Sequence, residues 1–133
     1  MSKKVSRSLD RLCVAAVAAM FLGMTSAHAE VVDIVWDISG SFQRDMEIAP
    51  GKFAEVCGRL RKGQAVAWSF KSDTPMDFNI HYHEGSNVVV PAKRDQTASL
   101  DGSLVAPTDQ DYCWMWQNGS GSKNKLSVGL RSG

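Results

Sequence analysis

Apolar and polar side chains alternate along several short stretches of the chain. In residues 77–83 the even positions are apolar and the odd positions are polar, and residues 125–131 repeat this pattern near the end. Along residues 64–71 a valine, a tryptophan and a phenylalanine share one face. A period of two residues is typical of a β-strand that is buried on one side. Two further stretches, 31–37 and 111–117, are apolar on both faces, which predicts central strands.

Turn-forming residues separate these stretches at short intervals. The turn-like sequences are Ser39-Gly40, Pro50-Gly51, Lys62-Gly63, residues 72–75, residues 84–86, Asp101-Gly102 and residues 118–122. Residues 53–60 have some apolar residues at helical spacing, but the stretch is short and Gly58 interrupts it, so we interpret it as a strand that carries Cys57. About eight short strands predict an all-β fold, an antiparallel β-sandwich of the jelly-roll kind.

The first 29 residues have the layout of a secretory signal peptide. Four basic residues precede an almost wholly apolar run at 12–24, and Ala27-His28-Ala29 places small residues where a signal peptidase reads them. The alternative is a membrane anchor, but as a helix this run would reach only about 20 Å, short of the ~30 Å hydrocarbon core. We expect cleavage before Glu30, which leaves residues 30–133 as a single domain in the periplasm or outside a cell, with a bacterium as the favoured source.

Cleavage changes the charge balance of the protein. Four of the 15 Lys and Arg residues and one of the 14 Asp and Glu residues lie in the first 29 residues, which leaves 11 positive and 13 negative side chains. A nearly neutral domain without a basic run does not have the electrostatic footprint of a protein that binds nucleic acid or an anionic membrane. We therefore expect no nucleic-acid partner and no stable membrane insertion after cleavage, and the oligomeric state is left open.

Cys57 and Cys113 are the two cysteines that follow the predicted cleavage point. An even number of cysteines in an oxidising compartment predicts a disulfide. It would close a loop of about 56 residues, which contributes ~3–4 kcal/mol in the chain-entropy model. The alternatives are two free thiols in the core and half of a metal site, although no Cys-x-x-Cys motif accompanies the pair.

The order of several motifs resembles that of GOLD (Golgi-dynamics) domains. The matching segments are Ala-Trp-Ser-Phe at 67–70, Met-Asp-Phe-Asn-Ile at 76–80, Tyr-Cys-Trp-Met-Trp-Gln-Asn at 112–118, the strand at 125–130, Ile-Ala-Pro-Gly at 48–51 and Arg-Lys-Gly at 61–63. The similarity spans most of residues 42–131. The chain departs from the pattern at Gln117, where GOLD domains carry Asp, and in the position of Cys113.

The resemblance implies a compact β-sandwich that acts as an interaction module and not as an enzyme. Such domains occur in cargo receptors and beside lipid-transfer domains, and some receptor members pair two cysteines across the sandwich. The resemblance does not extend to a lipid-transfer domain or a coiled coil, so it gives little support for a cargo or lipid partner. The resemblance therefore implies a free-standing, exported version with a partner in the cell envelope.

Tyr112, Trp114 and Trp116 fall on one face of a predicted strand, and Cys113 falls on the other. One interpretation places the three aromatic side chains in the core, where large rings contribute most of the burial. In the other interpretation Cys113 faces its disulfide partner, so the opposite, aromatic face of the strand is the outward one and forms a patch that binds a partner. We name these three residues as the candidate binding surface.

His81 and His83 lie two residues apart on a predicted strand, so both project from the same face. Such a pair can bind zinc or copper if a neighbouring strand supplies a third ligand, which the sequence does not identify. The alternative is that both histidines simply belong to a solvated strand face.

Nothing in the sequence indicates a catalytic centre or a cofactor. The Gly-Ser pairs do not form a nucleophile elbow, the carboxylates are scattered, and the predicted disulfide removes the thiols. We therefore expect a non-enzymatic exported module that recognises a protein, or in second place a lipid or a glycan. The alternative functions are a periplasmic zinc or copper protein that uses His81 and His83, and a structural subunit of an envelope assembly.

Overall fold

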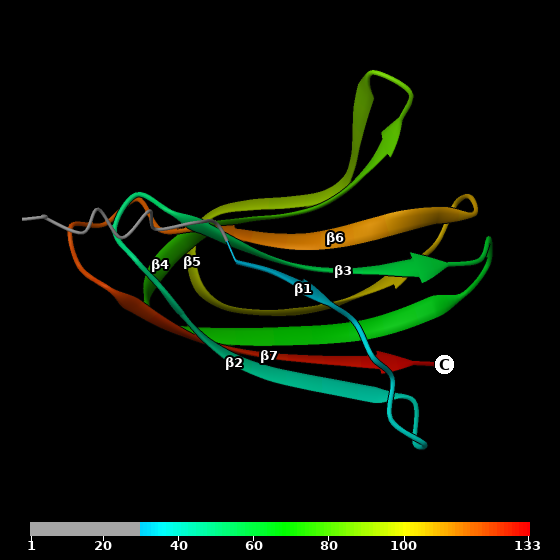
Figure 1. Cartoon of the computed structure of the whole chain (residues 1–133), viewed down its shortest axis with the longest axis horizontal. Coiled ribbons are helices and arrows are strands. Elements are labelled where there is room, and N and C mark those ends of the chain that lie inside the picture. Colours follow the sequence, from blue (N-terminus) through cyan, green and yellow to red (C-terminus); the bar gives the residue numbers. More distant parts are fainter. Residues whose placement is uncertain (1–29) are drawn as a thin grey trace, which may run out of the picture.

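A computed structural model of the protein describes residues 30–133, which form seven β-strands (Figure 1). The strands are β1 (Glu30–Asp33), β2 (Ser41–Ile48), β3 (Phe53–Leu60), β4 (Ala65–Glu84), β5 (Asn87–Val105), β6 (Gln110–Gln117) and β7 (Asn124–Ser132). The predicted signal peptide at 1–29 lies outside the described residues. No helix within residues 30–133 is long and apolar enough to cross a membrane.

All seven strands belong to one strongly bent sheet. The strand order is β1-β3-β6-β4-β7-β2, and β5 pairs with β4. The 20-residue strand β4 pairs with β7 along residues 66–72 and with β6 along residues 77–81. Because β4 changes neighbours at its middle, the sheet folds over on itself and is nearly closed, like a barrel (Figure 1).

The side chain of Asn124 holds the bend in β4. Its Oδ1 accepts hydrogen bonds from the backbone amides of Asp73 and Thr74 at 3.1 and 3.2 Å. Its Nδ2 donates to the carbonyl oxygen of Thr74 at 3.0 Å and to the hydroxyl of the same residue at 2.8 Å. This buried amide satisfies backbone groups that the irregular register leaves without sheet partners, so the chain can bend here without leaving the sheet.

The core is made by the inward faces of the alternating strands. Trp68 and Phe70 come from the first half of β4, Phe78 comes from its second half, and Trp116 comes from β6. Phe78 lies 4.9 Å from Trp68, 4.8 Å from Phe70 and 5.5 Å from Trp116, measured between ring centroids. These rings join the two halves of the bent sheet, and aromatic pairs at such distances contribute beyond their buried area.

The structure confirms the all-β prediction and corrects its details. Residues 30–133 form seven strands in one nearly closed, barrel-like sheet, so the predicted sandwich of about eight strands is not confirmed. The predicted turns at 72–75 and 101–102 lie inside β4 and β5. The stretch 31–37, predicted as a central strand, contributes only β1, which is an edge strand that pairs with β3 in the parallel sense.

Candidate functional site

The strands β3, β6 and β4 present a row of reactive side chains on their outer face. Cys57 of β3 is directly opposite Cys113 of β6, and Cys113 is in turn opposite His81 of β4. Cys57 and Cys113 form the predicted disulfide, with their Cα atoms 4.1 Å apart. Glu55 precedes Cys57 by two residues and therefore projects from the same face of β3. The pleated sheet thus brings four side chains together from three strands.

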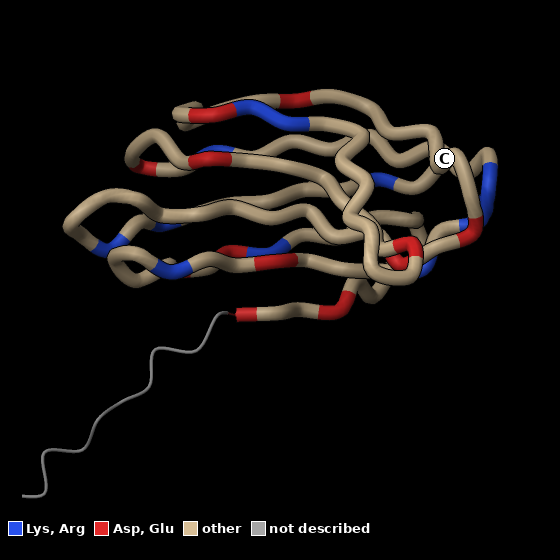
Figure 2. Tube along the Cα trace, turned by 90° about the horizontal axis from the view of Figure 1, so that it is seen from above, with Lys and Arg blue, Asp and Glu red and all other residues tan. Residues whose placement is uncertain are grey.

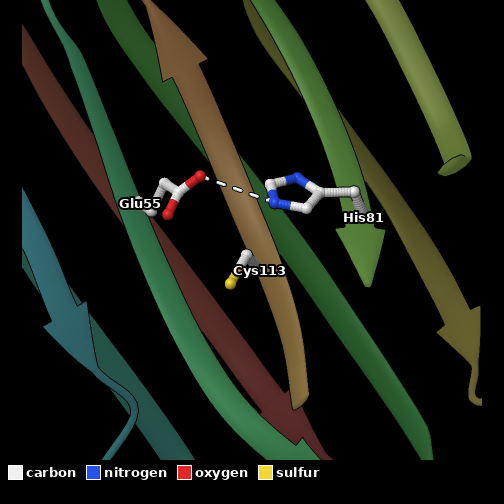
Figure 3. A group of neighbouring side chains, drawn as sticks. All are labelled: Glu55, His81 and Cys113. Carbon is white, nitrogen blue, oxygen red and sulfur yellow. Dashed lines mark ion pairs between the residues drawn. The ribbon is translucent and has the colours of Figure 1, made fainter. Parts of the chain in front are cut away.

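His81 is the buried member of this group, with 8% of its surface exposed. Its Nε2 lies 3.5 Å from Oε1 of Glu55 (Figure 3). Its Nδ1 lies 2.8 Å from Oδ1 of Asn79. Burial lowers the pKa of His81, against the opposing effect of the Glu55 carboxylate, and His83 lowers it further. Burial thus favours the neutral imidazole, which has an oxygen neighbour at each ring nitrogen, Glu55 at Nε2 and Asn79 at Nδ1.

A groove of about 310 Å³ lies beside His81, and we call it the hairpin groove. Its lining residues are Glu55, Asn79, His81, His83, Val88, Val90 and Met115. One wall is the β4–β5 hairpin, which turns at Gly85 and projects from the body of the domain (Figure 1). Val88 and Val90 remain 55% and 46% exposed. The groove thus combines an apolar wall with a polar floor.

The two predicted histidines lie as expected on one strand face, with their ring centroids 5.4 Å apart. The carboxylate that sequence reasoning missed is Glu55. It approaches His81 across the intervening strand β6, and its ligand atoms lie within 4.8 Å of those of His81 and Cys113. The period of two along β3 indicates that Glu55 and Cys57 share a face. No sequence signal indicates that β4, which carries His81, lies two strands away from β3 in the sheet.

The predicted aromatic binding surface is wrong. Tyr112, Trp114 and Trp116 are all 0% exposed and point into the core. The disulfide joins neighbouring strands on the outer face of the sheet and does not span the interior, so the aromatic face of β6 is the inner one. These side chains cannot contact a partner in the folded protein.

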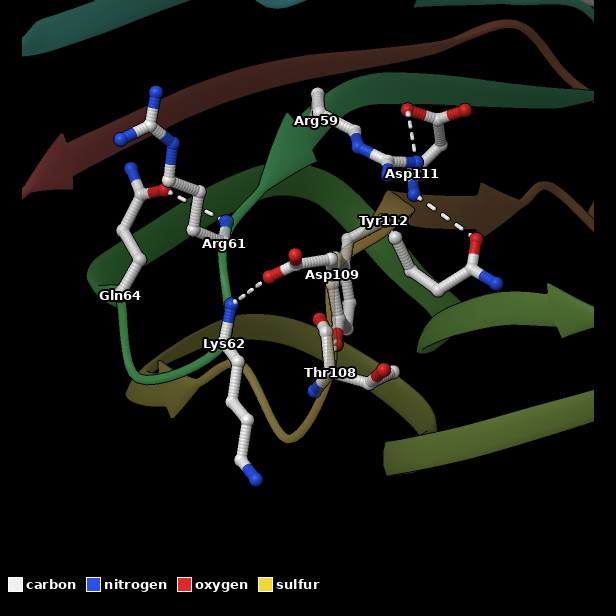
Figure 4. A network of polar contacts seen from close by, with 9 residues as sticks. Arg59, Arg61, Lys62, Gln64, Thr108, Asp109, Asp111 and Tyr112 are labelled. Carbon is white, nitrogen blue, oxygen red and sulfur yellow. Dashed lines mark hydrogen bonds and ion pairs between the residues drawn. The ribbon is translucent and has the colours of Figure 1, made fainter.

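Tyr112 instead holds the connection between β5 and β6. Its hydroxyl donates to the carbonyl oxygen of Thr108 at 2.8 Å, and burial raises its pKa. Beside it, Oδ1 of Asp109 accepts a hydrogen bond from the backbone amide of Lys62 at 2.7 Å (Figure 4). These contacts tie the β3–β4 turn to the β5–β6 connection and have a structural role.

A second exposed apolar feature lies in the loop between β1 and β2. Ile38 at its tip is fully exposed. Oδ1 of Asp37 accepts hydrogen bonds from the amide and hydroxyl of Ser39 at 2.8 and 2.7 Å and from the amide of Ser41 at 2.9 Å. The Ser39 hydroxyl and then the Ser41 amide hold the pKa of Asp37 below its ordinary value. A restrained loop therefore presents an aliphatic side chain to solvent.

Basic and acidic residues are interspersed along the described strands and turns (Figure 2). A hollow of about 530 Å³ lies over β2, β7, β4 and β5, and its charged lining residues are Asp101 and Arg131. The grouping of titratable side chains with exposed aliphatic residues occurs at the hairpin groove, which we therefore take as the candidate functional site.

Comparison with known proteins gives no match among family models or curated sequences. Solved structures do match. The chain is similar to PliG, a periplasmic inhibitor of g-type lysozyme, from Aeromonas hydrophila, with a TM-score of 0.63, 13% identity and coverage of 79% of this chain and 97% of that one. PliG of Salmonella Typhimurium matches with a TM-score of 0.59, 19% identity and coverage of 80% and 100%. A PliG mutant from Escherichia coli matches with a TM-score of 0.54, 15% identity and coverage of 80% and 100%.

The likeness is one of fold. At this level of identity it does not place the chain in a family. It does overturn the GOLD assignment, because the similar structures named above are PliG proteins and none of them is a GOLD domain. The motifs that suggested a GOLD domain are a Trp-x-Phe strand, alternating strands and Gly turns. They reflect the requirements of a small β-domain in general.

Proposed function

We propose that residues 30–133 act as an exported, non-enzymatic protein that binds and inhibits a peptidoglycan-cleaving enzyme of the lysozyme class. The observation that carries this proposal is the fold match over 97–100% of three periplasmic inhibitors of g-type lysozyme. A further support is chemical: both sulfurs of Cys57 and Cys113 are held in the disulfide, so neither supplies a thiol nucleophile.

The hairpin groove is the proposed contact surface. Val88 and Val90 project from a hairpin that stands away from the body of the domain, where a partner can approach them. Burying aliphatic side chains at the centre of an interface contributes most of the affinity, while polar groups around them fix the orientation of the partner. Here Glu55, Asn79 and His83 would supply these polar contacts.

The test is an inhibition assay with the purified mature chain. A g-type lysozyme, and separately a lysozyme of a different fold, is allowed to clear a cell-wall suspension in the presence of increasing amounts of the protein. We expect inhibition with a defined stoichiometry, and direct binding by calorimetry. If the protein neither binds nor inhibits either of the two enzymes, the proposed function is refuted.

A matched pair of variants tests the contact surface. Val88→Asp with Val90→Asp places two carboxylates in the contact, and we expect affinity to fall by about 3 kcal/mol, more than a hundred-fold in Kd. Val105→Asp is the control, because Val105 is 61% exposed and lies at the other end of β5. Equal affinities for the two variants would exclude the hairpin groove.

The loop that carries Ile38 is the second candidate surface, because a fully exposed isoleucine on a restrained loop has the properties of an interface anchor. Loss of inhibition in Ile38→Asp, with inhibition retained in the Val88 and Val90 variant, would assign the contact to this loop.

A further inference from the structure

Four potential metal ligands meet on the outer face of β3, β6 and β4. They are the sulfurs of Cys57 and Cys113, Nε2 of His81 and the carboxylate of Glu55. Sheet pairing fixes the positions, since Cys57, Cys113 and His81 form a directly paired row. Glu55 lies two residues before Cys57, on the same face of β3. The covalent bond between the two sulfurs keeps both of them from acting as thiolate ligands.

The separations in this group are close to those in a tetrahedral zinc site. Nε2 of His81 lies 3.5 Å from Oε1 of Glu55, and Sγ of Cys57 lies 3.9 Å from Oε2 of Glu55. The ligand atoms of Glu55, His81 and Cys113 are all within 4.8 Å of one another. Zinc–nitrogen and zinc–sulfur bonds of about 2.0 and 2.3 Å place tetrahedral ligands roughly 3.3–3.8 Å apart, so the two separations of 3.5 and 3.9 Å are close to the tetrahedral values.

A second contact orients the imidazole for metal binding. Nδ1 of His81 lies 2.8 Å from Oδ1 of Asn79 and can donate to it, which leaves Nε2 as the free ligand atom. This arrangement, in which the non-ligating nitrogen donates to an oxygen, is the usual support for a metal-binding histidine. The exposed ring of His83 has its centroid 5.4 Å from that of His81 and is not a member of this group.

We propose that reduction of the Cys57–Cys113 disulfide converts this group into a zinc site with two thiolates, one imidazole and one carboxylate as ligands. The disulfide sulfurs are uncharged and bind metals weakly, so the oxidised protein offers only Glu55 and His81 as strong ligands. The inference goes beyond the proposed function and does not depend on it.

The reaction balances with a dithiol or phosphine reductant. A dithiol delivers two electrons and two protons to the S–S bond, gives two cysteine thiols and is itself oxidised to a disulfide. Zn²⁺ then forms two Zn–S bonds, and the two thiol protons are released to solvent. A Cys₂HisGlu ligand set carries three negative charges against the two positive charges of the ion, so the filled site has a net charge of −1.

The experiment uses the mature chain and Co²⁺ as a spectroscopic probe for the zinc site. The oxidised protein and the phosphine-reduced protein are titrated with Co²⁺ and then with Zn²⁺. We expect the reduced protein to bind one equivalent, with tetrahedral cobalt absorption and a thiolate charge-transfer band that Zn²⁺ abolishes. Equal binding by the oxidised protein, or no binding by the reduced protein, would overturn the proposal.

Three variants test the ligand set. We expect His81→Ala and Glu55→Gln to weaken Zn²⁺ binding by the reduced protein roughly ten-fold or more, and His83→Ala to leave it unchanged. An unchanged affinity in His81→Ala would show that the thiols alone bind the ion. A loss in His83→Ala as large as that in His81→Ala would overturn the proposed ligands.

Reduction can also loosen the fold, and near-ultraviolet circular dichroism of the buried tryptophans reports this. If reduction abolishes that signal, Zn²⁺ must restore it in the reduced wild-type protein. It must not restore it in a Cys57→Ser, Cys113→Ser variant examined under the same conditions. Failure of zinc to restore the signal in the wild-type protein would count against the site, because metal binding to a built site is coupled to folding.

Discussion

Gly102 offers a sharp test of how tightly the core is packed. It lies near the end of β5, directly opposite Trp68 of β4. A methyl group on Gly102 would lie 2.5 Å from Cζ2, 3.0 Å from Cε2 and 3.2 Å from Cη2 of the Trp68 ring. The indole therefore occupies the space that a side chain at Gly102 would need, which makes Gly102→Ala an overpacking substitution.

The size of the effect follows from the distances. Non-bonded carbon atoms prefer a separation of about 3.5–4.0 Å, so the ring must move by about 1 Å. Trp68 is 8% exposed, and its ring centroid lies 4.9 Å from that of Phe78, so the movement is passed on to the aromatic cluster. Overpacking of this kind costs ~1–3 kcal/mol, a large part of the ~5–15 kcal/mol that stabilises a typical domain.

Urea denaturation followed by tryptophan fluorescence measures the change. We expect Gly102→Ala to lower the free energy of unfolding by about 2 kcal/mol. Gly129→Ala is the matched control, because a methyl group there would meet only Oγ of Ser69 at 3.6 Å, an ordinary contact. In a Trp68→Leu background the cost of Gly102→Ala should fall, since the obstructing ring is gone. An unchanged cost in that background would refute the reasoning.

Two further predictions concern the core and the β1–β2 loop. Trp116→Ala should lower the free energy of unfolding by ~3–5 kcal/mol, because the ring is fully buried. Trp116→Phe should cost less, because it keeps an aromatic ring and removes an indole N–H that has no hydrogen-bond partner. A native denaturation midpoint in Trp116→Ala would contradict the buried position. The protection of the Ser39 and Ser41 amides from hydrogen exchange, measured relative to the intrinsic rate at the same pH, should be high above the ordinary Asp37 pKa of 3.8. This protection should be lost as the pH falls through the lowered pKa of the folded state, where the carboxylate loses its charge. Asp37→Asn should accelerate exchange at neutral pH, and equal rates in the variant and the wild-type protein would exclude this restraint.

The alternation of residues determined the fold class from the sequence alone. Which side chains share a face is a local property of a strand, so the alternating residues 77–83 and 125–131 both appear as strand segments in the structure. The pairing of Cys57 with Cys113 also followed from composition, because only two cysteines remain after the predicted cleavage point. These conclusions required no knowledge of which strands are neighbours.

The tertiary structure decided the strand count and the direction of each face. Residues 72–75 have turn-forming composition, but Asn124 from a distant strand supplies their hydrogen bonds and keeps β4 continuous. The sequence predicts a turn at Asp101-Gly102, but Gly102 is a strand residue. Because it has no side chain, the ring of Trp68 fits against it. In both places a partner remote in the sequence changes the meaning of a local signal.

The candidate site depends on the same kind of remote information. A period of two shows that Trp114 and Trp116 share a face opposite Cys113, but the period is equally consistent with either face being buried. Only the pairing of β3 with β6 places the disulfide on the outer face and the indoles in the core. The approach of Glu55 to His81 requires the strand order β3-β6-β4, which long-range hydrogen bonds set and no short stretch of sequence records.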